Sequence, residues 1–280
     1  MAETKSSSGP KSVEKPETGT RLSALEMHDN VLGAAEEEME RPASSLALSS
    51  LAAGLAIGFS FLAGAFLAHF TPDDLDPLVT AAAYPLGFIF VVRARNELFT
   101  ENTLEPIIPL LHERSGERLR KMLRLWGILL VGNLVGAAIF ASVMAMTPAV
   151  EDAIRPELLT LAREATSEPF GQMFYHAIFA GWLIALLTWL LASTHSAGAQ
   201  LVLIWLATAP IQAFKFKHSI AGSVEAFYRA SLGDASWAEM LGRFTVPTVL
   251  GNAVGGVVLV ALLNFGQVAA EERKRERGEK

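Results

Sequence analysis

"VVRARNELFTENTLEP", residues 91–106, interrupts a long apolar part of the chain. Residues 78–90 carry no charge, and "IIPLL" at 107–111 is apolar again. Charged and polar side chains gather inside the interruption, at Arg93, Arg95, Glu97, Thr100, Glu101 and Asn102. Lipid cannot hydrogen-bond irregular backbone, so such a segment at membrane depth must face protein or water. The stretch therefore predicts a broken transmembrane helix that faces inward.

Four other runs contain no Asp, Glu, Lys or Arg, namely 43–70, 125–150, 169–214 and 244–270. A crossing takes roughly 20 helical residues, so the 46-residue run at 169–214 predicts two crossings. The stretch "SAGA" at 196–199 is the expected turn between them. With the broken segment at 78–111, six crossings result. The composition agrees, because only 19% of residues are charged, against about a quarter in soluble domains.

Lys and Arg counts near the membrane orient the loops. The segments 112–124 and 271–280 contain five each, 147–168 contains two, and 71–77 and 230–240 contain none. The alternation predicts that both termini are cytoplasmic. We expect a disordered tail at 1–20, a cytoplasmic or interfacial helix at 21–42, a transmembrane transport domain at 43–268 and a charged tail at 269–280. A solvated helix with no further role is the alternative for 21–41.

Several classes of site and partner have no sequence signal. The chain has no cysteine, which excludes disulfides and thiolate metal sites. No apolar core of a signal peptide occurs in the first 42 residues, so no cleavable signal is expected. The net charge of −6 says little about partners, and we expect no nucleic-acid partner, cofactor or metal. An enzyme would need convergent nucleophile, base or ligand residues within the membrane, and no such set is found.

The chain also repeats itself. Gly132-Asn133-x-x-Gly136 recurs as Gly251-Asn252-x-x-Gly255, and "AAGL" at 52–55 resembles "FAGW" at 179–182. A second polar break, "KFKHSIAGS" at 215–223, pairs with the first if Thr100 is matched to His218. Three crossings per repeat is an odd number, so the copies must insert with opposite orientation. Breaks at matching places in inverted repeats, here in helices 2 and 5, indicate a transport site.

The two breaks are expected to start half-helices. Thr100 can cap one from Glu101 to about Leu111, and His218 with Ser219 can cap another through about Arg229. Helix N-termini favour anions. We interpret His218 as the central functional residue, because an ionisable group in a membrane helix break is a functional candidate by default. A buried histidine bonded to a backbone carbonyl is the alternative.

Two further groups flank the breaks. One group consists of cations that could attract anions: Arg93, Arg95, Lys215 and Lys217. Alternatively, these side chains reach the lipid headgroups or form ion pairs with Glu97, Glu101 and Glu225. The expected ion pair is Arg95 with Glu97 or Glu101. Apolar side chains that could form a dry constriction, or merely pack, are Tyr84, Phe88, Leu98, Phe99 and Ile211.

"ELFTENT", "GNLVGA", "AGWLIALLTWL" and "KHSIAG", in this order over about 33–266, resemble the formate/nitrite transporter family, and most of all its bacterial inner-membrane branch. The resemblance implies an aquaporin-like fold and a homopentamer in the inner membrane with one pore per protomer. It also implies passage of small monovalent anions such as formate, nitrite, hydrosulfide or lactate, often with a proton. The family's pore histidine falls on His218 and its loop threonine on Thr100. We add Asn102 and Ser219 as candidate pore residues.

The chain departs from the family at two positions. The helix-5 lysine that helps to attract anions falls on Gln200, and the Asn four residues after the histidine falls on Gly222. The four cations beside the breaks could replace the missing charge. The rival interpretations are a neutral-solute pore, which the absence of Asn-Pro-Ala at the breaks disfavours, and a scaffold that has lost transport. A neutral His218 would make conduction channel-like, and a proton-relaying one would make it proton-coupled.

Overall fold

The computed structural model describes residues 22–72 and 75–276. The predicted tail at 1–20 lies outside these residues. The described part is helical, with α1 Ala24–Glu40, α2 Ala43–His69, α3 Asp76–Ala83, α4 Pro85–Arg93, a 3₁₀ turn η1 Glu101–Thr103, α5 Ile107–His112, α6 Gly116–Met146, α7 Arg155–Ala165, α8 Phe170–Leu191, α9 Ala197–Ala213, α10 Ser219–Leu232, α11 Trp237–Met240, π-helical η2 Leu241–Thr245, α12 Val246–Val254, π-helical η3 Gly255–Ala261 and α13 Leu262–Glu276.

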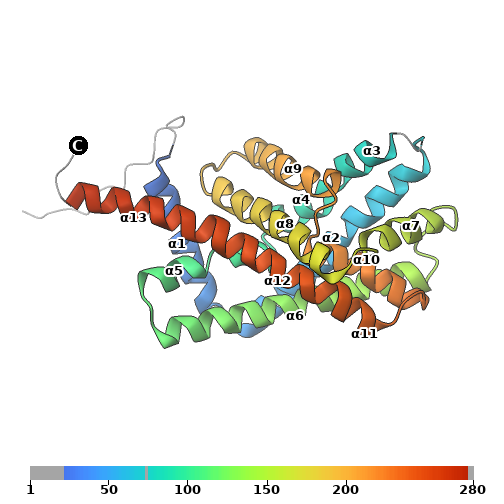
Figure 1. The fold of residues 1–280 in the computed structure, drawn as a ribbon, viewed down its shortest axis with the longest axis horizontal. Coiled ribbons are helices and arrows are strands. Elements are labelled where there is room, and N and C mark those ends of the chain that lie inside the picture. The colour runs from blue at the N-terminus through green and yellow to red at the C-terminus, as the bar shows by residue number, and fades with distance from the viewer. Residues whose placement is uncertain (1–21, 73–74, 277–280) are drawn as a thin grey trace, which may run out of the picture.

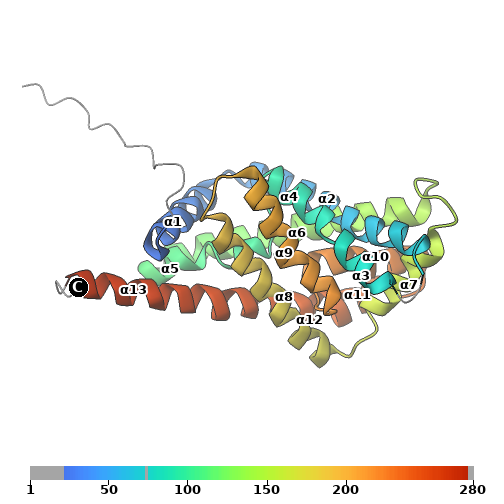
Figure 2. The ribbon, with the colours of Figure 1, turned by 90° about the horizontal axis from the view of Figure 1, so that it is seen from above.

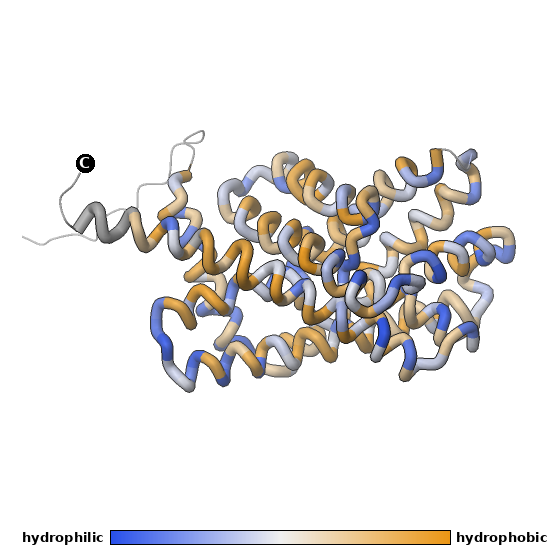
Figure 3. Tube along the Cα trace, in the orientation of Figure 1, coloured by the Kyte–Doolittle hydropathy of each residue, from blue (hydrophilic) through white to orange (hydrophobic). Residues whose placement is uncertain are grey.

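The helices form an elongated bundle with two distinct ends (Figure 1). One end carries α1, α5 and the far part of α13, and the other carries α3, α7 and α11, in both views (Figures 1 and 2). Hydrophobic residues follow the long helices between these ends, and hydrophilic residues gather in the connections (Figure 3). We call the two ends the α1 end and the α7 end.

Five described helical stretches are long and apolar enough to cross a membrane: Ala43–His69, Asp76–Arg93, Gly116–Met146, Phe170–Leu191 and Trp237–Ala270. The remaining predicted crossing corresponds to α9, a shorter apolar helix. It is shorter because it ends at the second break. The predicted turn at 196–199 is wrong in position: Ser196 already caps α9, so the turn lies before it, after Leu191.

The helix α1 is docked against the rest of the chain. Its start is a capping box, in which Ser23 and Glu26 bond each other's backbone N–H. Its buried face includes Val31 and His28, whose Nε2 lies 2.7 Å from Nε2 of His112 on α5. Helix α1 is therefore not solvated on all sides, because one of its faces packs against the rest of the chain.

The two breaks have the same backbone geometry. Arg95, two residues after α4, has φ 54°, and Lys215, two residues after α9, has φ 55°. In both, the residue after the left-handed one donates back to the last turn: Asn96 N to Val91 O at 3.0 Å, and Phe216 N to Ile211 O at 2.8 Å. This is the Schellman ending, which usually employs glycine at the left-handed position. Non-glycine residues there cost of order 1–3 kcal/mol, so the surrounding structure must hold them in place.

Asn133, on α6, holds the first break. Its Nδ2 donates to Ser50 O at 2.8 Å and to Glu97 O at 2.9 Å. Its Oδ1 accepts from Phe99 N at 2.7 Å. One buried side chain thus satisfies two backbone groups of the break, Glu97 O and Phe99 N, and ties the break to α2 through Ser50 O.

Asn252, on α12, holds the second break in the same way. Its Nδ2 donates to Ala177 O at 2.7 Å and to Lys217 O at 2.9 Å, and its Oδ1 accepts from Ser219 N at 2.8 Å. The equivalent partners are therefore Glu97 with Lys217 and Phe99 with Ser219. This corrects the predicted match by two positions: His218 takes the place of Leu98, not of Thr100.

Small residues bring the long helices of each repeat into backbone contact. A Cβ on Gly136 would lie 2.4 Å from Leu51 O, and one on Gly255 would lie 2.1 Å from Ile178 O. The other glycines of the two motifs, Gly132 and Gly251, are equally close to α2 and α8. The two repeats place Arg93 at the α1 end and Lys215 at the α7 end, as inverted copies require.

The half-helix predicted from Glu101 to Leu111 forms only in pieces, η1 and α5. Pro106 and Pro109 lack the N–H groups that a continuous helix needs. The Thr100 side chain makes no capping bond, so that prediction is wrong. The second half-helix is intact as α10, and the prediction that His218 caps it is confirmed, because its side chain accepts from Ala221 N.

Candidate functional site

The two breaks meet at a hydrogen bond between Thr100 and His218. Thr100 Oγ1 and His218 Nε2 lie 2.8 Å apart, and both residues are buried, with exposed fractions of 0% and 1%. Thr100 is held in turn by Thr103, whose hydroxyl donates to Thr100 O at 2.8 Å. The structure thus brings together the loop threonine and the histidine from opposite repeats.

The hydrogen bonds of His218 assign its tautomer. Its Nδ1 accepts from Ala221 N at 3.1 Å, so this nitrogen carries no hydrogen. A neutral imidazole then has its hydrogen on Nε2, which donates to Thr100 Oγ1. Protonation of Nδ1 would break the cap of α10. The fold therefore favours a neutral His218 that acts as a hydrogen-bond donor.

Aromatic rings surround this pair. The Phe88 ring meets the His218 ring edge-on with centroids 4.9 Å apart, and Tyr84 lies 5.3 Å from Phe88. Phe99 instead packs edge-on against Trp126 of α6 at 5.8 Å. All five predicted constriction residues are buried in one hydrophobic cluster: Tyr84, Phe88, Leu98, Phe99 and Ile211.

Asn102 and Ser219 lie beside the breaks with different roles. Asn102 Nδ2 donates to Glu97 Oε2 at 3.0 Å and to Leu98 O at 3.2 Å, so it braces the first break. The Ser219 hydroxyl is buried and has no hydrogen-bond partner among the described residues. A polar group without a partner next to His218 is available to a polar solute.

At the α1 end, Arg93 meets the position where the resemblance expects a lysine. Its Nη1 donates to Gln200 Oε1. Gln200 Nε2 donates to Thr194 O at 2.9 Å, which fixes the amide. A guanidinium from α4 is thus held beside the start of α9. Arg93 and Arg95 are both exposed, but only Arg93 has a described side-chain partner.

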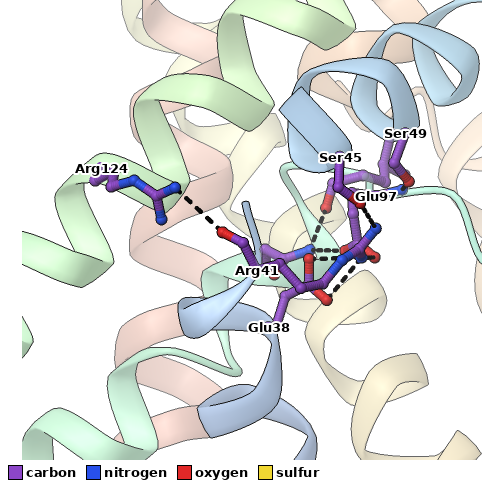
Figure 4. A network of polar contacts seen from close by, with 8 residues as sticks. Glu38, Arg41, Ser45, Ser49, Glu97 and Arg124 are labelled. Carbon is purple, nitrogen blue, oxygen red and sulfur yellow. Dashed lines mark hydrogen bonds and ion pairs between the residues drawn. The ribbon is translucent and has the colours of Figure 1, made fainter. Parts of the chain in front are cut away.

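The predicted pairing of Arg95 with Glu97 is wrong, because Arg41 pairs with Glu97 instead (Figure 4). Arg41 Nη1 lies 2.8 Å from Glu97 Oε1 and 2.8 Å from Glu38 Oε2. The Arg95 side chain forms no ion pair with a carboxylate of the described residues, Glu101 included. Burial raises the pKa of Glu38, and the hydrogen bond from Arg41 opposes the rise. Sequence reasoning missed Arg41, although a cation directly before Pro42 at a membrane boundary was a usable signal.

At the α7 end, both lysines are paired. Lys215 forms an ion pair with Glu164, and Lys217 Nζ lies 3.2 Å from Glu168 Oε1. Their side chains are 62% and 7% exposed, so Lys215 lies at the rim and Lys217 lies inside. The four predicted cations therefore do not form one cluster; they divide between the two ends.

Gly222 is explained by its neighbour. A Cβ at this position would lie 2.3 Å from the Phe244 ring. Phe244 is 1% exposed and cannot move aside freely. The ring thus occupies the space that an asparagine side chain would need. Among the described residues no group of three or more His, Cys, Asp and Glu could hold a metal ion.

Comparisons with known proteins agree with this geometry. Residues 25–266 match the formate/nitrite transporter family. The inner membrane protein YfdC of Escherichia coli (strain K12) is 31% identical over 270 residues, which cover 96% of this chain and 86% of the relative. A probable formate transporter of Methanothermobacter thermautotrophicus is 28% identical over 241 residues, covering 75% of this chain and 87% of the relative.

Two solved structures share the fold. A pentameric formate channel with formate bound has a TM-score of 0.70 at 24% identity, covering 81% of this chain and 98% of that chain. An FNT family ion channel has a TM-score of 0.71 at 22% identity, covering 87% and 98%. The fold is therefore the aquaporin-like one of these channels. Together, the family match over most of the chain and the paired breaks place this protein in the formate/nitrite transporter family.

Proposed function

We propose that the chain passes small monovalent anions, such as formate or nitrite, across the membrane through a pore in each protomer. The observation that carries the proposal is the buried Thr100–His218 hydrogen bond where the two breaks meet. A small anion that enters an apolar constriction loses several kcal/mol of hydration. The N-terminus of α10 and the nearby Ser219 hydroxyl offset part of that loss.

The arrangement of cations supports the same function. At the α1 end, Arg93 forms no ion pair with a described carboxylate and bonds to the uncharged Gln200, whereas at the α7 end Lys217 is paired with Glu168. Arg93 is held beside Gln200, so a cation lies next to the position where the family's lysine is missing. A formate transporter among the relatives and a formate-bound channel among the structural neighbours favour a carboxylate substrate.

The proposed assembly is a homopentamer, because one structural neighbour is pentameric. Many large hydrophobic side chains on the long helices are exposed on the single chain, Val131, Val135 and Ile139 among them. Lipid and neighbouring protomers would cover such faces. Light scattering of the purified protein, corrected for detergent, is expected to give the mass of five chains; a monomer or dimer would contradict the assembly.

The test of transport is flux in proteoliposomes. Vesicles that contain a pH dye are exposed to formate, nitrite, hydrosulfide, lactate and acetate, with wild type and His218→Ala. His195→Ala, in the exposed turn before α9, is the matched control. We expect anion-dependent flux that His218→Ala lowers and His195→Ala leaves unchanged. Absence of flux with every anion, in folded pentameric protein, would instead favour the scaffold or a pore for another solute.

A further inference from the structure

A cavity of about 100 Å³ at the α7 end leads to His218. One face of α10 contributes His218, Gly222 and Glu225 to its lining. Residues four and seven positions apart lie on the same side of a helix, so Glu225 stands two turns outward from His218. The volume is room for several water molecules or one small carboxylate.

The other charged and titratable groups that face this cavity come from three places: the α3–α4 segment, α7 and the second break. They are Asp76, Tyr84, Glu164, Lys215 and Lys217. Glu164 pairs with Lys215, and Lys217 pairs with Glu168, which also receives His176 Nδ1 at 2.9 Å. Both lysines are therefore neutralised by carboxylates.

Glu225 differs from these acids. No described residue forms an ion pair or a hydrogen bond with its carboxyl, although the residue is half-buried and lines the cavity. An ionised carboxylate there would repel an arriving anion, since the nearby lysines are already paired. A protonated carboxyl would instead donate a hydrogen bond to the anion. The state of this one group thus decides whether the cavity accepts an anion.

His218 is poorly suited to supply a proton, because its Nδ1 is committed to the cap of α10. Glu225 has no such commitment and lies nearer to the exposed rim marked by Lys215. Water at the rim can return a proton to it.

We propose that Glu225 is a substrate-contacting residue that gives its proton to a weak-acid anion in this cavity. The O–H bond of Glu225 breaks, and an O–H bond forms on the substrate carboxylate. The solute becomes neutral, Glu225 becomes a carboxylate, and the total charge is unchanged. A hydronium ion from the adjacent water then reprotonates Glu225. The neutral acid continues past Phe88 and His218 at a smaller desolvation cost.

The inference rests on the proposed function, and the test compares formate flux in proteoliposomes across pH for Glu225→Gln, Glu225→Asp and wild type. Glu151→Gln is the matched control, since it removes the same charge from an exposed position in the 147–168 loop. Folding and assembly of each variant are checked by gel filtration and thermal unfolding.

We expect Glu225→Gln to lose about tenfold or more of the flux, as for loss of a general acid, and to lose its pH dependence. Glu225→Asp keeps a carboxyl and is expected to retain the wild-type pH profile. Residual flux in Glu225→Gln should respond to membrane potential, whereas wild-type flux should not, because only an unprotonated solute carries charge.

Two results would overturn the inference. One is a Glu225→Gln variant that keeps the wild-type rate and pH profile. The other is a Glu225→Gln variant that gains flux at neutral pH, which would show a carboxylate that only repels anions. If wild type carries anions and His218→Ala impairs it while Glu225→Gln does not, this inference alone fails. If wild type carries no anion, the proposed function fails and the inference with it.

Discussion

At the scale of single residues, the Thr100 hydroxyl is the partner of the His218 Nε2–H. Thr100→Val keeps the shape and removes the acceptor. A buried donor without a partner costs about 1–3 kcal/mol, so Thr100→Val should lower thermal stability and reduce anion flux. Thr100→Ser keeps the hydroxyl and should stay close to wild type. Equal stability and flux in the Val and Ser variants would show that the bond is not important.

Gly222 and Phe244 should behave as a coupled pair. Any Cβ at 222 meets the ring at 2.3 Å, so Gly222→Ala should destabilise by about 1–3 kcal/mol, as overpacking does. In a Phe244→Ala background the same substitution should cost less, by about 1 kcal/mol or more. The free energy of unfolding is measured by heat or denaturant for wild type, Gly222→Ala, Phe244→Ala and the double variant, which together form a double-mutant cycle. Additive effects would contradict the account of the missing asparagine.

The sequence predicts those site residues that belong to a recognisable pattern, such as an ionisable residue within a break in a transmembrane helix. His218 was found as an ionisable residue in a break, and its capping role followed from its position. Arg41 and Glu225 were not assigned a site role, because their importance depends on which groups remain unpaired after folding. The ion pair between Arg41 and Glu97 could not be predicted from their spacing, because the two residues are 56 positions apart in the sequence.

At the scale of elements, α4 and α9 meet at the α1 end, where Arg93 of α4 donates a hydrogen bond to Gln200 of α9. Arg93→Gln removes this cation and should lower the rate of formate uptake severalfold, since steering of a charged solute depends on such charges. Adding Gln200→Lys to Arg93→Gln should restore uptake, because a cation returns to the same place from the other helix. The rate at low and high salt is the measurement, and salt should diminish the difference. Failure of the second substitution to restore uptake would exclude a charge effect.

The link between α7 and α10 should depend on pH. Hydrogen bonds from Arg163 and then Arg229 lower the pKa of Asp234 from 3.8 to about 2. A lowered pKa in the folded state gives stability above the unfolded value, and this stability is lost as pH falls through the folded one. Asp234→Asn should therefore lower the unfolding temperature at neutral pH. The difference from wild type should shrink as the pH falls from 3.8 to about 2; an unchanged difference there would contradict the assignment.

Helix positions followed from apolar runs, whereas helix ends did not. The 46-residue run indicated two helices, but the turn fell earlier than "SAGA" because Ser196 caps α9. The half-helix after Thr100 was overestimated because two prolines interrupt it. The sequence match of the two breaks was wrong by two positions, because it aligned the polar residues Thr100 and His218. The structure aligns the backbone groups that Asn133 and Asn252 bind, which places His218 at the position of Leu98.

At the scale of the whole molecule, the inverted repeat gives the two ends different chemistry. The α1 end gathers Arg41, Arg93 and Glu97, and the α7 end gathers lysines, glutamates and the cavity beside Glu225. Equivalent backbone positions, Glu97 and Lys217, carry opposite charges. The backbone plan is therefore duplicated, while the side chains differ between the two ends of the molecule.

The orientation of the chain in the membrane can be tested with single introduced cysteines. The chain has none of its own, so an introduced cysteine is the only thiol of this protein that a maleimide can label. Ala149 and Arg114 are both exposed, the first in the 147–168 loop and the second before α6. The distribution of Lys and Arg predicts that a membrane-impermeant maleimide labels Ala149→Cys in intact cells and Arg114→Cys only after permeabilisation. The reverse result would place α1 outside. Labelling of both from outside would contradict the odd number of crossings between them, and with it the inverted repeat.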